Sequence, residues 1–221
     1  NNSFDLKAAA DHGVTVCGTG TVGAPTVGIT FGLMLELTRR IGFENQRMKA
    51  GEPWQVTLGR DLEGLTPGVV GFGKLGHRVA AVAQAFGMKV IAWSQNLTPE
   101  DAEKAGVRYA TKEQLFSEAD IVTIHYALSE RSRGIVGAAD LGRMKRDACL
   151  INTARGPLVD EAALLDALRA KKIAGAGLDV FDVEPLPVDH PFRTLDNVVL
   201  TPHLGYVSEQ NYRIYFRDIV E

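Results

Sequence analysis

Short runs of apolar residues recur along the chain, and most of them are continuous instead of alternating with polar residues. They occupy residues 69–70, 89–93 (KVIAW), 121–124 (IVTI), 149–152 (CLIN), 176–180 (AGLDV) and 198–200 (VVL). A strand that is buried on both faces shows such a continuous run, as in a parallel sheet. We therefore predict that these runs are the strands of one parallel sheet.

Segments with apolar residues at helical spacing lie between these strands. They occupy residues 75–86, 99–104, 112–119, 138–144 and 160–171. Residues 51–66 are the one plausible irregular connection before the first strand. We expect Pro67 to mark the entry to that strand, because proline is tolerated at a strand's first residue. Alternation of strands and helices predicts an α/β fold with a doubly wound parallel sheet and right-handed crossovers.

The composition is that of a globular protein and limits the partners of the chain. Apolar residues make up 45% and charged residues 23% of the chain, so a sizeable core can form. The formal net charge of -3 gives no electrostatic case for nucleic acid or an anionic membrane as a partner. We see no signal peptide at the N-terminus and no apolar stretch that approaches the ~20 residues of a membrane span. Cys17 and Cys149 have no metal-ligand spacing, so we expect no metal site and a reducing, cytoplasmic location.

The pattern G-x-G-x-x-G occurs twice, from Gly18 to Gly23 and from Gly71 to Gly76. The second match follows the strand at 69–70 and opens a helix, and the next strand ends at Trp93. In that context the glycines allow a tight turn and close approach of a pyrophosphate to the helix N-terminus. The first match follows a possible strand (VTVC), but no further strand comes at the expected distance, so we interpret it as a glycine turn into a helix. The second match therefore predicts the phosphate-binding loop of a dinucleotide site.

The residue after the second strand usually reports which dinucleotide is bound. An acidic residue there binds the ribose 2′-hydroxyl of NAD, whereas a nearby arginine accepts the phosphate of NADP. Here the candidates are Ser94, Gln95 and Asn96, none of which is charged. The sequence leaves NAD and NADP both open as the cofactor.

Three later motifs carry a resemblance to a known family. They are residues 152–156 (NTARG), 179–186 (DVFDVEPL) and 201–205 (TPHLG). In this order and spacing, together with the glycine loop, the chain resembles the D-isomer-specific 2-hydroxyacid dehydrogenases over most of its length. The resemblance implies an NAD(P)-binding Rossmann fold and hydride transfer between a nicotinamide and a small 2-hydroxyacid or 2-ketoacid.

The resemblance implies three catalytic residues. Arg155 would grip the carboxylate and carbonyl of the substrate, a bidentate task that suits a guanidinium. His203 would donate a proton to the carbonyl oxygen, and Glu184 would pair with His203 and hold its tautomer. The related formate dehydrogenases carry Gln at the position of Glu184, so Glu184 favours a 2-hydroxyacid over formate.

The resemblance also implies contacts with the cofactor and with a second subunit. The implied cofactor-binding residues are Gly71, Gly73, Lys74, Leu75, Gly76, Ser94, Ala127, Leu128, Thr153, Asp179 and Gly205. The apolar helix expected over 26–38 would lie at the contact between the subunits of a homodimer. His125, after the third strand, would either face the cofactor or have a structural role.

Two departures from the family pattern matter. Ser94 stands where an acidic residue is common, and the substrate-binding lobe that precedes the nucleotide domain in the family is largely absent from this chain. We expect residues 1–25 to be a link from that lobe, 26–206 the dinucleotide-binding domain, and 207–221 the start of a helix that returns to the lobe. A non-catalytic dinucleotide sensor is the alternative, and a methyltransferase with the same architecture would leave Arg155, Glu184 and His203 unexplained.

Overall fold

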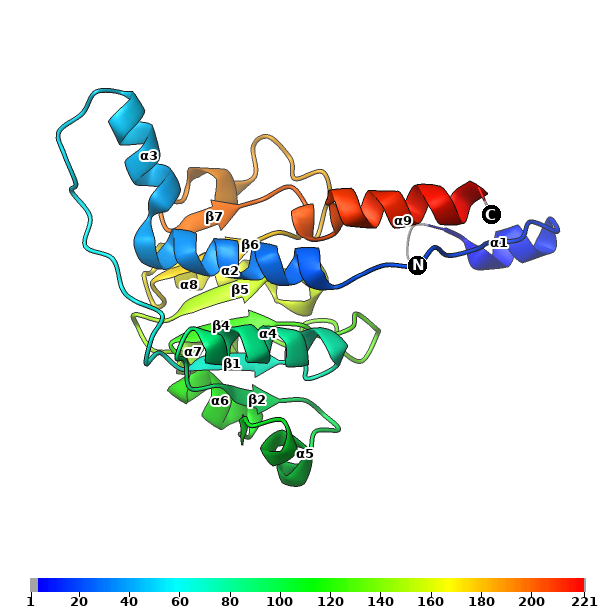
Figure 1. The fold of residues 1–221 in the computed structure, drawn as a ribbon, viewed down its shortest axis with the longest axis horizontal. Helices are drawn as coiled ribbons and strands as arrows, with labels where there is room; N and C mark the ends of the chain where they lie inside the picture. Colours follow the sequence, from blue (N-terminus) through cyan, green and yellow to red (C-terminus); the bar gives the residue numbers. More distant parts are fainter. Residues whose placement is uncertain (1–3, 221) are drawn as a thin grey trace.

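The computed structural model describes residues 4–220 and shows one seven-stranded sheet in which every strand pair is parallel (Figure 1). The spatial order of the strands is β3-β2-β1-β4-β5-β6-β7. Their bounds are β1 (Pro67–Val70), β2 (Ile91–Trp93), β3 (Arg108–Tyr109), β4 (Ile121–Ile124), β5 (Cys149–Asn152), β6 (Gly175–Leu178) and β7 (Val198–Leu200). Strands β2 and β3 follow on one side of β1, and β4 to β7 follow on the other. The chain therefore reverses its direction across the sheet between β1 and β4, and ligands bind at such a switch point.

Helices cover both faces of this sheet. The helices are α1 (Leu6–Asp11), α2 (Ala24–Arg39), α3 (Ile41–Lys49), α4 (Lys74–Ala85), α5 (Pro99–Lys104), α6 (Lys112–Glu118), α7 (Ala138–Arg143), α8 (Glu161–Arg169) and α9 (Glu209–Val220). One apolar core joins α6, α7 and α8 to the sheet and contains Leu150, while the other joins α2 and α4 to it and contains the next residue, Ile151. Because successive strand residues point to opposite faces, both of which are covered, strands β1, β4 and β5 are buried at every position and consist mostly of apolar residues.

The predicted doubly wound sheet is confirmed, with differences at the ends of elements. The strand expected over 89–93 begins only at Ile91, and the one expected over 176–180 ends at Leu178 because its pairing with β7 ends there. Pro67 opens β1 as expected. Three short elements were not predicted, namely α1, α3 and the two-residue edge strand β3. Each is too short or too exposed to carry a clear hydrophobic period.

Two segments project from the body of the molecule at opposite ends (Figure 1). At the end to which the strand arrows point lie α1 and α9, and residues just before α2 are tied to α9, since the Val22 amide donates to Asn211 Oδ1 over 2.9 Å. At the other end lies an arm formed by α3 and residues 50–61. This arm exposes the apolar side chains of Ile41, Met48, Trp54, Val56 and Leu58.

Helix α2 contains the segment for which a subunit contact was expected. Its side chains Phe31, Leu33 and Met34 are buried within this chain, against the sheet and α4. Intrachain packing therefore uses much of the apolar surface of this helix, while Ile29, Leu35 and Leu37 are only partly buried. None of the helices between residues 4 and 220 is long and apolar enough to cross a membrane.

Candidate functional site at the carboxyl ends of the strands

The second glycine motif forms a strand–turn–helix, as predicted. Strand β1 ends at Val70, and α4 begins at Lys74. Gly71 has φ +93, and a Cβ there would lie 2.6 Å from the His125 carbonyl oxygen. A Cβ on Gly76 would lie 2.3 Å from the Gly71 carbonyl oxygen, so both glycines are required by the chain's own backbone.

Gly73 is different, because nothing in the protein explains why it lacks a side chain. Its φ of -88° suits any residue, and a Cβ would meet no atom within 4 Å. No side chain caps α4, so its first N–H groups, which include those of Lys74 and Leu75, lack the usual cap. Open space beside free N–H groups at a helix N-terminus fits a bound phosphate. The loop therefore has the features that a dinucleotide pyrophosphate requires.

The first glycine motif differs from the second in the segment before it and in the partners of its N–H groups. The segment 14–17 that was a possible strand is exposed and irregular. The Gly20 amide donates to Asp218 Oδ2 over 2.7 Å, and the Val22 amide is bound by α9 as described above. Two N–H groups of this motif are thus engaged within the protein, and the motif leads into α2 at Ala24, which confirms the interpretation as a turn into a helix.

A pocket of about 540 Å³ lies beside the phosphate loop. Ser94, directly after β2, lines it together with residues that the sequence did not single out. The further lining residues are Phe72, Gly73, His77, Asn96, Leu97, Asp101, Lys104 and Ala105. Charges of both signs line this pocket, because Asp101 and Lys104 both belong to its wall. The two side chains form an ion pair at 3.5 Å. No pattern in the sequence pointed to α5 as a wall of the site.

The NTARG segment folds into a turn after β5. The Asn152 side chain organises this turn, since its amide donates to the Arg155 carbonyl oxygen over 2.9 Å and its Oδ1 accepts from the Ala154 amide over 3.1 Å. A Cβ on Gly156 would lie 2.1 Å from the Phe181 carbonyl carbon, so glycine is required there. The turn leaves Arg155 exposed and Thr153 buried. Asn152 is a site residue that the motif contained but whose role the sequence did not reveal.

His203 and Glu184 meet after β7 and β6. Nδ1 of His203 donates to Oε2 of Glu184 over 2.6 Å, and both side chains are about one-third exposed, 31% and 35% respectively. Oε1 of Glu184 accepts from the Phe181 amide over 2.9 Å, which fixes the carboxylate. The expected pairing of these two residues is therefore present in the structure.

Asp179 lies below this pair and is fully buried. Its carboxylate accepts hydrogen bonds from the Thr201 hydroxyl at 2.6 Å, the Leu204 amide at 2.7 Å and the Gly205 amide at 2.8 Å. These bonds hold the turn in which His203 has the left-handed backbone, φ 54 and ψ 50. A non-glycine residue in this region is strained and is held there by its surroundings.

The other expected cofactor residues also lie at this edge of the sheet. Ala127 and Leu128 lie in the loop after β4, where the Ala127 carbonyl oxygen accepts from the Ser132 hydroxyl over 2.7 Å. His125 opens that loop with its ring buried, and its Nε2 lies 2.8 Å from the Thr123 hydroxyl. Burial lowers the pKa of His125 to about 3, so the ring is neutral. The carboxyl ends of β1, β2, β4, β5, β6 and β7 thus carry all of the expected site residues.

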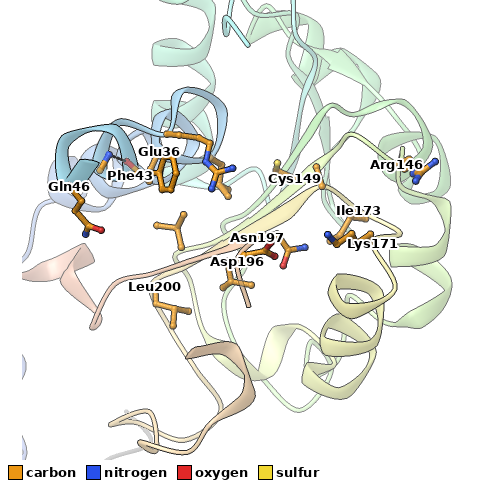
Figure 2. A pocket seen from close by; sticks show the side chains of 16 residues that line it. Glu36, Phe43, Gln46, Arg146, Cys149, Lys171, Ile173, Asp196, Asn197 and Leu200 are labelled. Carbon is orange, nitrogen blue, oxygen red and sulfur yellow. Dashed lines mark hydrogen bonds between the residues drawn. The ribbon is translucent and has the colours of Figure 1, made fainter. Parts of the chain in front are cut away.

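A second cavity, of about 660 Å³, lies elsewhere. Figure 2 shows it between α2 and α3 on one side and the segment Asp196 to Leu200 on the other, at the amino ends of β5 to β7. Cys149 lies at its margin, and burial raises the pKa of this thiol to about 11. None of the motif residues lines this cavity, so it is not the candidate site.

Comparisons with known proteins agree with this placement. The model of the family "D-isomer specific 2-hydroxyacid dehydrogenase, NAD binding domain" matches residues 31–205. A glyoxylate reductase of Korarchaeum cryptofilum is 40% identical over 217 residues, which are 95% of this chain and 65% of that protein. A D-3-phosphoglycerate dehydrogenase of Methanocaldococcus jannaschii is 39% identical over 213 residues, 95% of this chain and 40% of that protein.

Solved structures show the same fold. The crystal structure of a phosphoglycerate oxidoreductase from Vibrio cholerae superposes with a TM-score of 0.93 at 34% identity, covering 99% of this chain and 71% of that one. A glyoxylate reductase from Paecilomyes thermophila gives a TM-score of 0.83 at 34% identity, covering 96% and 65%. The chain spans about 65% of the length of the glyoxylate reductases that it matches. It belongs to the D-isomer specific 2-hydroxyacid dehydrogenase family, of which it forms the NAD binding domain.

Proposed function

We propose that the complete protein interconverts a small 2-ketoacid and the corresponding D-2-hydroxyacid with a nicotinamide dinucleotide. The observation that carries this proposal is the hydrogen-bonded pair of His203 and Glu184 at the same sheet edge as the phosphate loop and Arg155. Relatives that are named glyoxylate reductase and D-3-phosphoglycerate dehydrogenase support this substrate class. A binding protein that does not turn over substrate has no need of this pair.

The His203–Glu184 pair is built for proton transfer. Because Nδ1 of His203 donates to the Glu184 carboxylate, Nε2 is the nitrogen that can carry the transferred proton. In reduction, Nε2 gives its proton to the carbonyl oxygen of the substrate, and in oxidation it takes the proton from the hydroxyl. The Glu184 carboxylate accepts from Nδ1 in both directions, so Nε2 alone carries the exchanged proton. A bound reduced nicotinamide supplies the hydride that the carbonyl carbon accepts.

Arg155 is the residue we propose for substrate binding. Arg155 is exposed, and among the described residues its guanidinium donates one hydrogen bond, to the neighbouring Ala154 carbonyl oxygen, which leaves further donors free. Arg155 follows β5 and His203 follows β7, two strand spacings or about 10 Å apart along the sheet edge. A ketoacid that spans part of this gap would present its carboxylate to Arg155 and its carbonyl oxygen to His203.

Substitutions at the two charged residues test the proposal. We expect Arg155→Ala and His203→Asn in the complete protein each to lower kcat/KM for glyoxylate by about 100-fold or more, because each removes a group that touches the reacting substrate. His190→Asn is the matched control, since His190 also pairs with a carboxylate, Glu161 at 3.1 Å, but lies outside the site. This control should change kcat/KM by less than about threefold. Undiminished turnover in His203→Asn would overturn the mechanism.

A parallel fluorescence titration with NADH and NADPH separates the remaining alternatives. Ser94 and Asn96 carry no charge, whereas Asp101 and Lys104 offer both signs, so the pocket does not commit to one cofactor. Saturable binding of either supports the dinucleotide site, and the ratio of the two dissociation constants assigns the preference. Tight binding without reduction of any 2-ketoacid would instead support the non-catalytic sensor.

The domain boundaries and the location of the protein remain part of the proposal. We propose that residues 1–25 and 207–221 connect the nucleotide domain to the second lobe. In support, α1 buries no residue and α9 exposes Phe216 and Ile219, so these helices have apolar surface to cover. A cytoplasmic location fits the exposed thiol of Cys17.

We also propose a homodimer, with its contact placed differently from the sequence-based expectation. Helix α2 is used by intrachain packing, whereas the arm of α3 and residues 50–61 exposes 71% of Trp54 and all of Leu58. Apolar side chains clustered on a projecting segment are typical of an interface.

A further inference from the structure

Two threonine hydroxyls on α2 connect this helix to both loops that carry the site. Thr26 Oγ1 donates to the Gly205 carbonyl oxygen over 2.7 Å, and Gly205 lies two residues after His203. One turn further along, Thr30 Oγ1 lies 2.9 Å from Thr153 Oγ1, and Thr153 lies two residues before Arg155. We propose that Thr26 and Thr30 are positioning residues that set the His203 turn and the Thr153 hydroxyl relative to each other, and this inference rests on the proposed function.

The number of hydroxyl protons determines which threonine donates in each of these hydrogen bonds. Thr30 has one hydroxyl proton, and it is donated to the Thr26 carbonyl oxygen at 2.8 Å. The bond between Thr30 and Thr153 must therefore be donated by Thr153. Thr153 then has only lone pairs left, so its hydroxyl meets the cofactor as an acceptor of hydrogen bonds. A ribose hydroxyl of a nicotinamide nucleotide is a donor that fits it.

The His203 turn is held from two sides by this arrangement. Asp179 accepts the Leu204 and Gly205 amides from below, and Thr26 donates to the Gly205 carbonyl oxygen from α2. Between these anchors His203 keeps its left-handed backbone conformation. This conformation is strained for histidine, whereas glycine would adopt it without strain. Loss of the Thr26 hydroxyl removes the anchor on the side of α2 and leaves the turn to the bonds of Asp179 and the pairing of His203 with Glu184.

Burial makes the contact of Thr30 and Thr153 strong enough to matter. Thr30 is fully buried, and Thr153 is 5% exposed, so water does not compete for either hydroxyl. Removing the Thr30 hydroxyl leaves the Thr153 proton without its acceptor. Helix α2 also packs against β5, β6 and β7, so it is a rigid element that spans the strands leading to Thr153 and His203.

Helix α2 itself offers a matched control. Thr38 is buried, at 8% exposure, and its hydroxyl donates to the Met34 carbonyl oxygen over 2.8 Å, as Thr30 donates to Thr26. Within the described residues, the Thr38 hydroxyl bonds only to the backbone of its own helix. Thr38→Val therefore removes the same bond within the helix but leaves the site loops untouched.

The test compares Thr26→Val, Thr30→Val and Thr38→Val in the complete protein. We expect Thr30→Val to raise the dissociation constant of the preferred nicotinamide dinucleotide about tenfold, through Thr153. Thr26→Val should lower kcat about tenfold and move the His203 limb of the pH–rate profile, with little change in dinucleotide affinity. Thr30→Ser, which keeps the hydroxyl, should restore the affinity.

A measurement without cofactor keeps this test separate from the proposed function. In amide hydrogen exchange of the cofactor-free protein, the segment 201–208 should exchange faster in Thr26→Val than in Thr38→Val at equal thermal stability. Equal exchange, equal affinity and equal kcat in all three valine variants would overturn the inference. Faster exchange in a protein that reduces no 2-ketoacid would support the anchor and refute the proposed function.

Discussion

Three histidines show how surroundings decide the chemistry of one side chain. His203 pairs with Glu184 and is 31% exposed, so a substrate can reach its free nitrogen. His190 also pairs with a carboxylate, but Nδ1 of its ring accepts the Phe192 amide and the pair ties a loop to α8. His125 is buried beside Thr123 and stays neutral. A histidine–carboxylate pair is therefore a candidate for catalysis only where its second nitrogen is free.

His125 gives a prediction about stability and pH. Its pKa is about 3 in the folded chain and 6.5 in the unfolded chain, so between these values only the unfolded chain binds the proton. Folding stability should therefore fall as the pH falls below 6.5, with a contribution from this residue of about 1.4 kcal/mol per pH unit. Urea unfolding at a series of pH values between 7 and 4 measures this slope.

The variant His125→Gln isolates that contribution, because glutamine does not titrate. Its stability at neutral pH need not match the native value, since the comparison concerns the slope alone. The exposed His12→Gln provides the reference. An unchanged slope in His125→Gln would mean that other groups cause the acid destabilisation.

At the scale of elements, the β1–loop–α4 unit assigns different roles to its glycines. Gly71 and Gly76 are required by backbone packing, because any Cβ would collide with a carbonyl oxygen of the protein. Gly73 faces open space and has an ordinary backbone conformation. The unit therefore separates the glycine that serves a ligand from the glycines that serve the fold.

Alanine substitutions test this division. Gly76→Ala should destabilise the domain by about 2 kcal/mol or more, because the added methyl group would collide with the Gly71 carbonyl oxygen. Gly73→Ala should leave the melting temperature within about 2 °C of the native value but weaken dinucleotide binding about tenfold, since the methyl group occupies the phosphate space. Thermal unfolding and NADH titration of both variants measure the two effects. Full NADH affinity in Gly73→Ala would show that the phosphates lie elsewhere.

At the scale of the whole molecule, the sheet brings distant parts of the sequence to one edge. Residues after β1, β5, β6 and β7 meet there because parallel strands all end on the same side. The arm of α3 and residues 50–61 projects from the other end (Figure 1), and it exposes apolar side chains outside the core. The candidate site and the proposed subunit contact thus occupy different regions of the fold.

The arm leads to a prediction about assembly. We expect the protein to be a dimer in light scattering coupled to size exclusion, and Trp54→Ser with Leu58→Ser to yield monomers, because both side chains are exposed in the single chain. Val188→Ser, an equally exposed apolar position at 91%, is the control and should leave the dimer intact. A native monomer would refute the dimer, and a dimer that survives both arm substitutions would move the contact elsewhere, including to α2.

Most of the fold could be predicted because its patterns are local. Continuous apolar runs indicated β1, β4, β5 and β7, and the glycine loop indicated the start of α4. The two-residue β3 and the helices α1 and α3 lacked such patterns, since few of their side chains are buried. For the same reason, the apolar residues of α2 suggested a partner subunit although they pack within the chain.

The sequence by itself determined the order of elements, the phosphate loop and the three motifs with Arg155, Glu184 and His203, because each depends on neighbouring residues. Only the tertiary structure decided the contacts between distant segments. It showed that Asp179 holds the His203 turn, that α5 lines the pocket beside Ser94, and that Thr26 and Thr30 reach the site loops. These contacts join residues far apart in the chain, and a hydroxyl or carboxylate in a sequence carries no record of which distant donor or acceptor the fold places beside it.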